Sequence, residues 1–230
     1  MRQKFLGVLA LAAIGTAASA SPLPCPVVGT GMDVYIALGT TGCIISDKLF
    51  YSFSLAGSDS TGGSGPAASA ITLTPDLADP NNPGILFSSS GWSVSGAGAF
   101  IDSTIGFKVK TLNGQPLIDD AGLGLISFAT GGGGEANIAE TIVLGGGPAF
   151  TTLSVDSAGG PFTDHKNFAP VSSVNVSKDL LVATGSGSDD RARISSFSEN
   201  FSEVPEPVTV ALIGSALFGL GLVRRRAVRR

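Results

Sequence analysis

Alternation of apolar and polar side chains is clearest in the stretch Lys48-Leu49-Phe50-Tyr51-Ser52-Phe53-Ser54-Leu55. A period of two residues is the pattern of a half-buried β-strand, whereas a helix repeats its apolar residues every three or four positions. The stretch therefore predicts a strand with Leu49, Tyr51, Phe53 and Leu55 on one face.

The same alternation recurs along the chain, in short runs separated by Gly, Ser and Pro. Asn113-Gly114 follows one such run and is a hairpin signal. This spacing favours an antiparallel β-sandwich or jelly roll for residues 21–203, within an all-β fold. The alternating apolar positions include Ile105, Phe107, Val109, Ile138, Ile142, Leu144, Leu153, Val155, Val174 and Val176, with Glu140 in the same series as Ile138 and Ile142.

Composition excludes several classes of protein. The body is rich in Gly, Ser and Thr and poor in charge, which argues against a helical bundle. Between the basic residues of the two ends, seven Lys and Arg stand against all eighteen Asp and Glu, a net charge of −11. Such an acidic body repels phosphate backbones, so we expect no nucleic-acid partner.

The first 20 residues have the three parts of a secretory signal. Arg2 and Lys4 precede the apolar run from Phe5 to Ile14, and Ala18-Ser19-Ala20 supplies small side chains for signal peptidase. We predict a signal helix over residues 1–20 that is cleaved after Ala20, with Ala18 and Ala20 as the recognition positions. An uncleaved anchor is the alternative that remains open.

The last 27 residues have a different three-part pattern. Val204-Pro205-Glu206-Pro207 (residues 204–207) is followed by an apolar run of 16 residues, 208–223, and then by a basic tail, 224–230. As a helix the run is about 24 Å long, against about 30 Å for the hydrocarbon core of a bilayer. Arg224, Arg225 and Arg226 predict a stop-transfer signal on the cytoplasmic side, which places the body outside the inner membrane.

Residues 204–230 resemble a PEP-CTERM sorting signal. The resemblance implies that a membrane-embedded exosortase recognises Pro205, Glu206 and Pro207, with residues 208–223 as a short transmembrane helix, and cleaves near the motif. An ordinary tail anchor is the alternative. The body also resembles one recurrent type of PEP-CTERM protein through residues 35–43 and 47–50, which implies a β-sandwich ectodomain without a known activity.

Two cysteines, Cys25 and Cys43, are the only ones in the chain. An even pair in an exported protein predicts a disulfide, which would close a loop of about 18 residues and stabilise the fold by roughly 3 kcal/mol in the chain-entropy model. Two unpaired thiols are the alternative.

Residue types that carry catalysis are sparse and scattered. His165 is the only histidine, and we interpret Asp164-His165-Lys166 as part of a surface loop after Gly159-Gly160-Pro161. We therefore expect no enzyme, no catalytic residue, no metal site and no cofactor. Asp119-Asp120 and Asp189-Asp190 leave calcium ligation open, although neither lies in a recognisable calcium loop.

These observations predict a structural or adhesive protein of the cell surface or the extracellular polysaccharide, anchored transiently in the inner membrane during export. The alternative is a sandwich that binds or hydrolyses carbohydrate, with a cleft lined by an exposed aromatic ring and two facing carboxylates. Tyr35, Tyr51 and Trp92 are the candidate aromatics, and burial is the favoured interpretation of Trp92.

Overall fold

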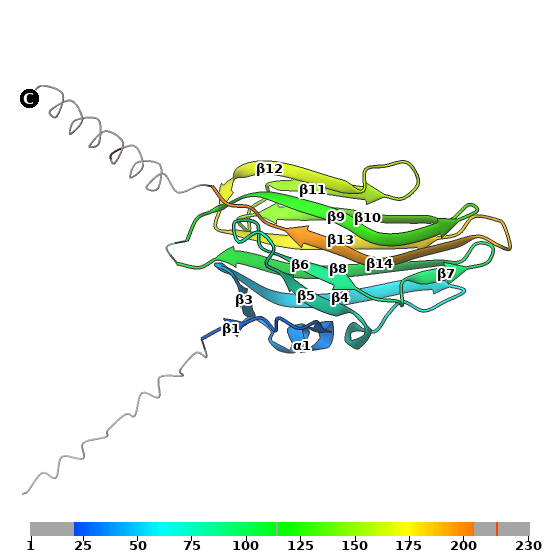
Figure 1. Cartoon of the computed structure of the whole chain (residues 1–230), viewed down its shortest axis with the longest axis horizontal. Coiled ribbons are helices and arrows are strands. Elements are labelled where there is room, and N and C mark those ends of the chain that lie inside the picture. Colours follow the sequence, from blue (N-terminus) through cyan, green and yellow to red (C-terminus); the bar gives the residue numbers. More distant parts are fainter. Residues whose placement is uncertain (1–20, 114, 205–214, 216–230) are drawn as a thin grey trace, which may run out of the picture.

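The protein is a β-sandwich of two sheets that pack face to face, as seen in a computed structural model (Figure 1). The structure describes residues 21–113, 115–204 and 215. The predicted all-β class is confirmed, whereas the predicted signal helix and transmembrane helix lie outside the described residues. Within those residues, no helix has the length and apolar character needed to cross a membrane.

The first sheet contains seven strands within the described part of the chain. Its neighbours are antiparallel except for the first pair, β1 and β3, which is parallel. In spatial order the strands are β1 (Leu23–Pro24), β3 (Cys43–Ile45), β4 (Lys48–Thr61), β8 (Phe100–Thr111), β13 (Ser173–Ala183), β10 (Glu135–Leu144) and β11 (Phe150–Asp156).

The second sheet is antiparallel throughout its described pairings. Its spatial order is β12 (Thr163–Val171), β9 (Ile118–Gly131), β14 (Arg191–Asn200), β6 (Gly84–Ser88), β5 (Thr72–Asp76) and β2 (Thr30–Gly31), while β7 (Ser93–Ser95) pairs with β14. Consecutive strands often lie in different sheets, so the chain crosses repeatedly between the two layers.

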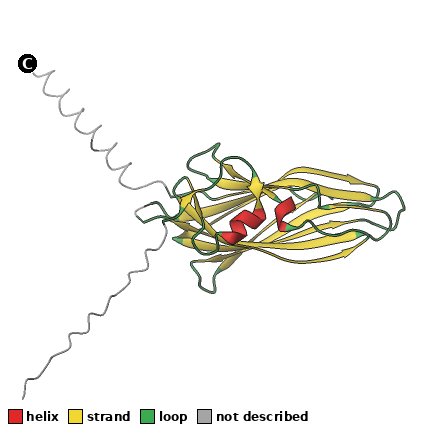
Figure 2. Cartoon of the chain, turned by 90° about the horizontal axis from the view of Figure 1, so that it is seen from below, coloured by secondary structure: helices red, strands yellow, loops and turns green. Residues whose placement is uncertain are grey.

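Two short helices, not predicted from the sequence, lie side by side against one edge of the sandwich (Figure 2). They are α1 (Met32–Ala37) and the 3₁₀ helix η1 (Ala68–Ala70). Helix α1 buries Met32 and Tyr35, and the Tyr35 ring meets the Phe53 ring edge to face at 5.2 Å between centroids. The helix therefore closes the core at the edge where β2 and β3 are short.

Aromatic side chains fill the space between the sheets. Phe107 of β8 lies at their centre, with ring centroids 5.4 Å from Phe53 and 5.9 Å from Phe87. Trp92 is fully buried, as predicted, and its Nε1–H donates to the hydroxyl of Ser103 (3.3 Å). The core thus joins residues of both sheets into one apolar cluster.

The predicted face of β4 is wrong at its start. Phe50 and Phe53 both point into the core, whereas Leu49 and Tyr51 lie on the outer face. The cause is a β-bulge: the register with β8 shifts between Tyr51 and Ser54, and Ser52 has a φ of 54°. An extra residue in one strand reverses the facing of all residues beyond it, so strict alternation fails there.

The hairpin predicted at Asn113-Gly114 does not form, because β8 and β9 lie in different sheets. Residues 112–117 connect the two strands. The N–H of Leu112, directly after β8, donates a hydrogen bond to the carbonyl of Asp47 (3.0 Å). Pro116 interrupts this segment and supplies no N–H donor, which does not suit a tight two-residue turn.

The predicted disulfide between Cys25 and Cys43 is confirmed, with the two Cα atoms 4.8 Å apart. It fastens β1 to β3, beside the backbone bond from the N–H of Cys25 to the carbonyl of Ile44 (2.9 Å). The start of the described chain is therefore held to the edge of the first sheet by covalent and hydrogen bonds.

The described sandwich begins and ends at the same end of the molecule, where its dark-blue start and its orange finish lie in Figure 1. The last residues are tied there by several contacts. Glu203 forms an isolated β-bridge with Ile118, and the N–H of Val204 donates to the carbonyl of Leu117 (3.1 Å). Residues 203 and 204 are thus fastened to the sandwich beside the start of β9.

Candidate functional site

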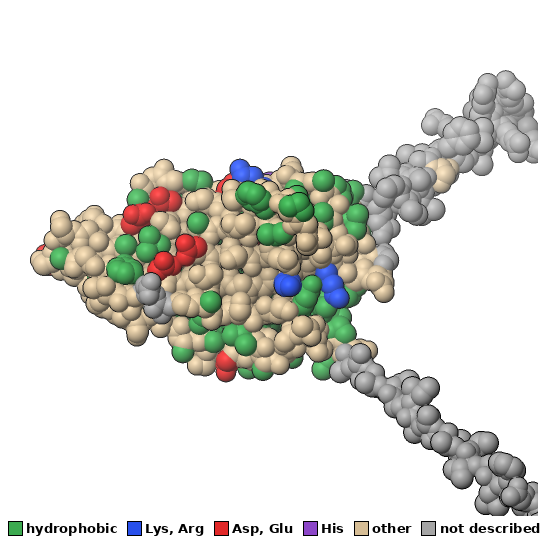
Figure 3. Space-filling model, turned by 180° about the vertical axis from the view of Figure 1, so that it is seen from behind, with side chains coloured by type: hydrophobic (Ala, Val, Ile, Leu, Met, Phe, Trp, Pro, Cys, Tyr) green, Lys and Arg blue, Asp and Glu red, His purple; other side chains and the backbone are tan. Residues whose placement is uncertain are grey.

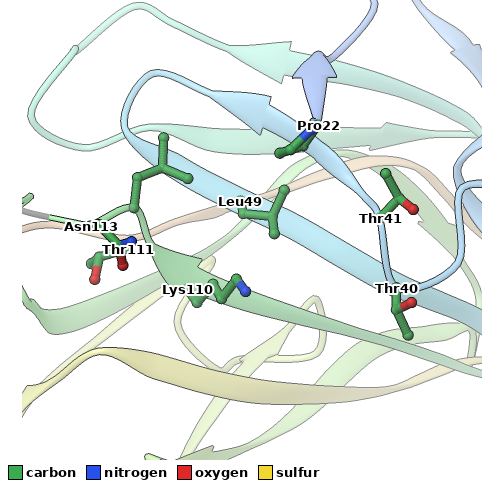
Figure 4. A pocket seen from close by; sticks show the side chains of 8 residues that line it. Pro22, Thr40, Thr41, Leu49, Lys110, Thr111 and Asn113 are labelled. Carbon is green, nitrogen blue, oxygen red and sulfur yellow. The ribbon is translucent and has the colours of Figure 1, made fainter. Parts of the chain in front are cut away.

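Two adjoining hollows lie on the outer face of the first sheet, near the end of β8. The first has a volume of about 440 Å³ and is shown in Figure 4. Threonine hydroxyls, a lysine amine and an asparagine amide line it together with a few apolar groups. Its residues are Pro22, Thr40, Thr41, Leu49, Lys110, Thr111, Leu112 and Asn113.

The second hollow, of about 420 Å³, lies on the other side of residues 110–113. It adds the ring of Tyr51, whose centroid is 5.5 Å from the Nζ of Lys110. The lysine ammonium therefore lies over the aromatic face, in the geometry of a cation–π contact. The hollow also includes Gln115, Leu117, Ser172 and Ser173. We call the two hollows together the Lys110 site.

Strand pairing explains why these side chains meet. Lys110 of β8 is paired with Leu49 of β4 on one side and with Ser173 of β13 on the other. The bulge in β4 turns Tyr51 outward beside Lys110, and the turn after α1 brings Thr40 and Thr41 over the same strands. The Lys110 site depends on the bulge, which is why the alternation in the sequence did not reveal it.

The molecular face in Figure 3 is largely uncharged and polar. On this face, Lys and Arg side chains lie near the end at which the described chain begins and ends and at the upper middle, whereas most acidic side chains lie toward the middle and the far end. The charged side chains are therefore not evenly spread over this face.

The other predicted aromatic candidates are not available to a ligand. Trp92 and Tyr35 are buried, and burial raises the pKa of Tyr35 to about 12. Neither hollow of the Lys110 site contains a carboxylate. The cleft with an aromatic ring and two facing carboxylates, which the hydrolytic alternative predicts, is not the arrangement found at this site.

His165 lies in a strand, β12, and not in the predicted loop. Its exposed ring is 3.5 Å from the carboxylate of Asp120 and 3.0 Å from the side-chain oxygen of Asn167. Asp164 accepts the N–H of Ser154 (2.9 Å) across to β11. These contacts attach β12 to its neighbouring strands.

The acidic pairs considered for calcium have structural partners. Asp120 accepts the N–H of Ser202 (3.0 Å), and Asp190 accepts those of Gly133 (2.9 Å) and Gly187 (3.0 Å). These two N–H donors hold the pKa of Asp190 below its ordinary value. Among the described residues, no group of three or more His, Cys, Asp or Glu lies close enough together to hold a metal ion.

A charged cluster inside the core was not predicted. Lys178 of β13, Glu140 of β10 and Glu199 of β14 are fully buried, and we call them the core charge cluster. The Nζ of Lys178 contacts Oε2 of Glu140 and donates to Oε2 of Glu199 (2.6 Å). The sequence carried a signal for it, because Glu140 and Lys178 occupy apolar positions of their alternating strands.

Burial governs the protonation of this cluster. It raises the pKa of Glu199 to about 7 from an ordinary value of 4.5, against the opposing effect of Lys178. Burial likewise lowers the pKa of Lys178, although Glu199 opposes that shift. Both shifts favour the neutral forms of the two groups.

A pH dependence of stability follows. The folded protein holds a proton on Glu199 up to about pH 7, whereas the unfolded chain releases it near pH 4.5. We expect the free energy of unfolding to fall by on the order of 2 kcal/mol as pH rises through this window. Urea unfolding at several pH values measures it, and Glu199→Gln should reduce the slope. Equal slopes in the two proteins would contradict the assignment.

A second buried lysine lies at the edge of the sandwich. Lys48 at the start of β4 contacts Glu203, and its Nζ is 3.1 Å from Oδ1 of Asp47. Burial raises the pKa of Glu203 to about 7, so this residue adds to the same pH dependence. The contact ties the first sheet to the last described residues before Pro205.

The predicted targeting residues are not part of the described structure. They comprise Ala18, Ala20, Pro205, Glu206, Pro207, Arg224, Arg225 and Arg226, and the predictions for them remain predictions.

No protein-family model and no curated protein sequence matches the chain. Among solved structures, it is similar to one described as TmCBM61 in complex with β-1,4-galactotriose, with 12% sequence identity and a TM-score of 0.32. The similarity covers 66% of this chain and 88% of that one. A likeness of this size does not establish a shared function.

Proposed function

We propose that this protein is a non-enzymatic component of the cell surface or extracellular polysaccharide, and that it contacts polysaccharide at the Lys110 site. The observation that carries the proposal is the outward-facing Tyr51 ring beside two hollows lined by hydroxyl, amide and amine groups. A ring face suits the apolar face of a sugar, and the surrounding donors and acceptors suit its hydroxyl groups.

The openness of the Lys110 site favours an adhesive role. The hollows lie side by side along residues 110–113 and are bounded by residues from five parts of the chain. Two adjoining hollows of this kind can contact successive sugars of a polymer. Weak contacts of this type gain strength when many copies of the protein engage one chain.

The sequence of the two chain ends supports export of the protein to the cell surface. Residues 1–20 direct export through signal peptidase, and residues 204–230 direct a transient stay in the inner membrane and then recognition by an exosortase. The attachment of Glu203 and Val204 to the sandwich fits this proposal, because the residue directly before the Pro-Glu-Pro motif is then fastened to the folded body.

Binding to an array of neutral and uronate-containing polysaccharide fragments tests the proposed contact. Tyr51→Ala should weaken binding about tenfold, because it removes the ring face and its contact with Lys110. The matched control is Phe150→Ala, which removes an exposed aromatic from β11, away from the Lys110 site. No binding by the unaltered protein, or equal losses in both variants, would contradict the proposal.

A further inference from the structure

The core charge cluster is costly if its three groups remain ions. Lys178, Glu140 and Glu199 have no exposed side-chain area, and one positive charge faces two negative charges. Oε1 of Glu140 and Oε1 of Glu199 have no hydrogen-bond partner within the described structure. Transfer of such ions from water costs several kcal/mol each, and an unpartnered buried oxygen adds to that cost.

The same arrangement places three complementary reactive groups together. Glu140 and Lys178 are directly paired across β10 and β13, and their side chains meet in the core. Glu199 reaches the same Nζ from the opposite sheet, at 2.6 Å. A nucleophilic amine, a carboxyl carbon and a second carboxyl group able to move protons therefore share one site.

The surroundings exclude water and favour neutral groups. The Nζ of Lys178 is 6.0 Å from the ring centroids of both Phe107 and Phe197. Burial lowers the pKa of Lys178 and raises that of Glu199, and both shifts favour transfer of a proton from the ammonium to a carboxylate. A neutral amine beside a protonated carboxyl group is the pair that condensation requires.

We infer that Lys178 and Glu140 become joined by an intramolecular amide bond once the sandwich has folded, with Glu199 as the proton carrier. This self-modification is independent of the polysaccharide contact proposed above. It links β10 to β13 covalently within the first sheet.

The reaction balances without any further reactant. The lone pair of the Nζ amine attacks Cδ of the protonated Glu140 carboxyl group, and the new N–C bond forms. In the reacting form the proton of the cluster is on Glu140, so Glu199 is a carboxylate; it accepts a proton from the nitrogen and delivers it to a hydroxyl oxygen on Cδ. The C–O bond to that hydroxyl then breaks, which releases one water molecule and leaves a neutral secondary amide. Glu199 ends as it began, and no atom is oxidised or reduced.

The bond removes the costly charges. An ammonium and a carboxylate are replaced by one neutral amide, so only Glu199 can still ionise in the cluster. Lys48 differs from Lys178 because its partners Asp47 and Glu203 keep 14% and 12% of their side-chain area exposed. Partial exposure lets water stabilise that ion pair, which makes Lys48 a natural control.

Tryptic mapping of the reduced and denatured protein, recovered from producing cells, tests the inference. Trypsin cuts after a free Lys178 and releases residues 167–178. An amide-linked Lys178 is not cut, so residues 167–191 should appear joined to residues 111–166, lighter than the two peptides together by one water molecule. Fragmentation of the joined species should place the bond between Lys178 and Glu140.

Variants separate the parts of the inference. Glu199→Gln keeps both joined residues but removes the proton carrier, so it should lower the joined fraction at least about tenfold. Lys48→Met should leave the joined species unchanged. Recovery of free 167–178 without any joined species from the unaltered protein overturns the inference, and this result needs no variant to fold. Attachment of Lys178 to the peptide that begins at residue 194 would overturn the choice of Glu140.

Discussion

Phe107→Ala should lower the free energy of unfolding by about 3–5 kcal/mol, because it removes a large ring from the centre of the core. Phe107 contacts Phe50 and Phe53 of one sheet, and Phe87 and Phe201 on the side of the other. The substitution leaves a cavity, so the surrounding side chains of both sheets lose their contacts with the ring. The strands of the two sheets are too rigid to collapse into that cavity. Urea unfolding followed by tryptophan fluorescence measures the loss.

Phe150→Ala is the matched control for this substitution. Phe150 is 66% exposed on β11, so its removal should change the free energy of unfolding by no more than about 0.5 kcal/mol. A Phe107→Ala protein as stable as the Phe150→Ala protein would show that the aromatic cluster does not hold the sheets together.

Glu206→Ala should convert the surface-located product into full-length protein retained in the inner membrane. The proposed reason is that Glu206 carries the only charge in the motif and stands between two prolines, a residue type that disfavours helical geometry in the residue before it. A 16-residue apolar run is also a poor permanent anchor. Mass spectrometry of the surface and inner-membrane fractions should show that residues 208–230 are absent from the unaltered surface protein.

Asp189→Ala controls for the loss of an acidic residue elsewhere, since Asp189 is exposed in the loop before β14. This variant should be sorted like the unaltered protein. Intact protein ending at Arg230 in the surface fraction would show that the tail acts as a plain anchor.

Local patterns in the sequence predicted the features that depend on local chemistry. Alternation of apolar and polar residues predicted the all-β class, and the even number of cysteines predicted the Cys25–Cys43 disulfide. The position of Trp92 within an apparent strand, Ser90-Gly91-Trp92-Ser93-Val94, favoured its burial, which the structure confirms. Each of these follows from the neighbours of a residue along the chain, and the disulfide also from the predicted export of the protein.

Features that depend on distant pairing could not be predicted in the same way. The bulge near Ser52 is visible only in the register of β4 against β8, and it alone brings Tyr51 to the Lys110 site. The core charge cluster joins Glu140, Lys178 and Glu199, whose strands meet only after the chain crosses between sheets. Alternation placed Glu140 in a core-facing series, but a single buried charge does not identify its partner.

The shared end of the described chain determines how far the molecule reaches. In the membrane-held form that we propose, attachment through the segment after Val204 leaves the opposite end, formed by strand-to-strand loops, farthest from the bilayer (Figure 1). Strand β4 has 14 residues and runs along the long axis, which corresponds to about 45 Å at about 3.3 Å per residue. In this form, the loops at the far end are the first part of the protein to contact neighbouring molecules. The Lys110 site lies at the end closer to the bilayer, where it would contact polymer held close to the membrane surface.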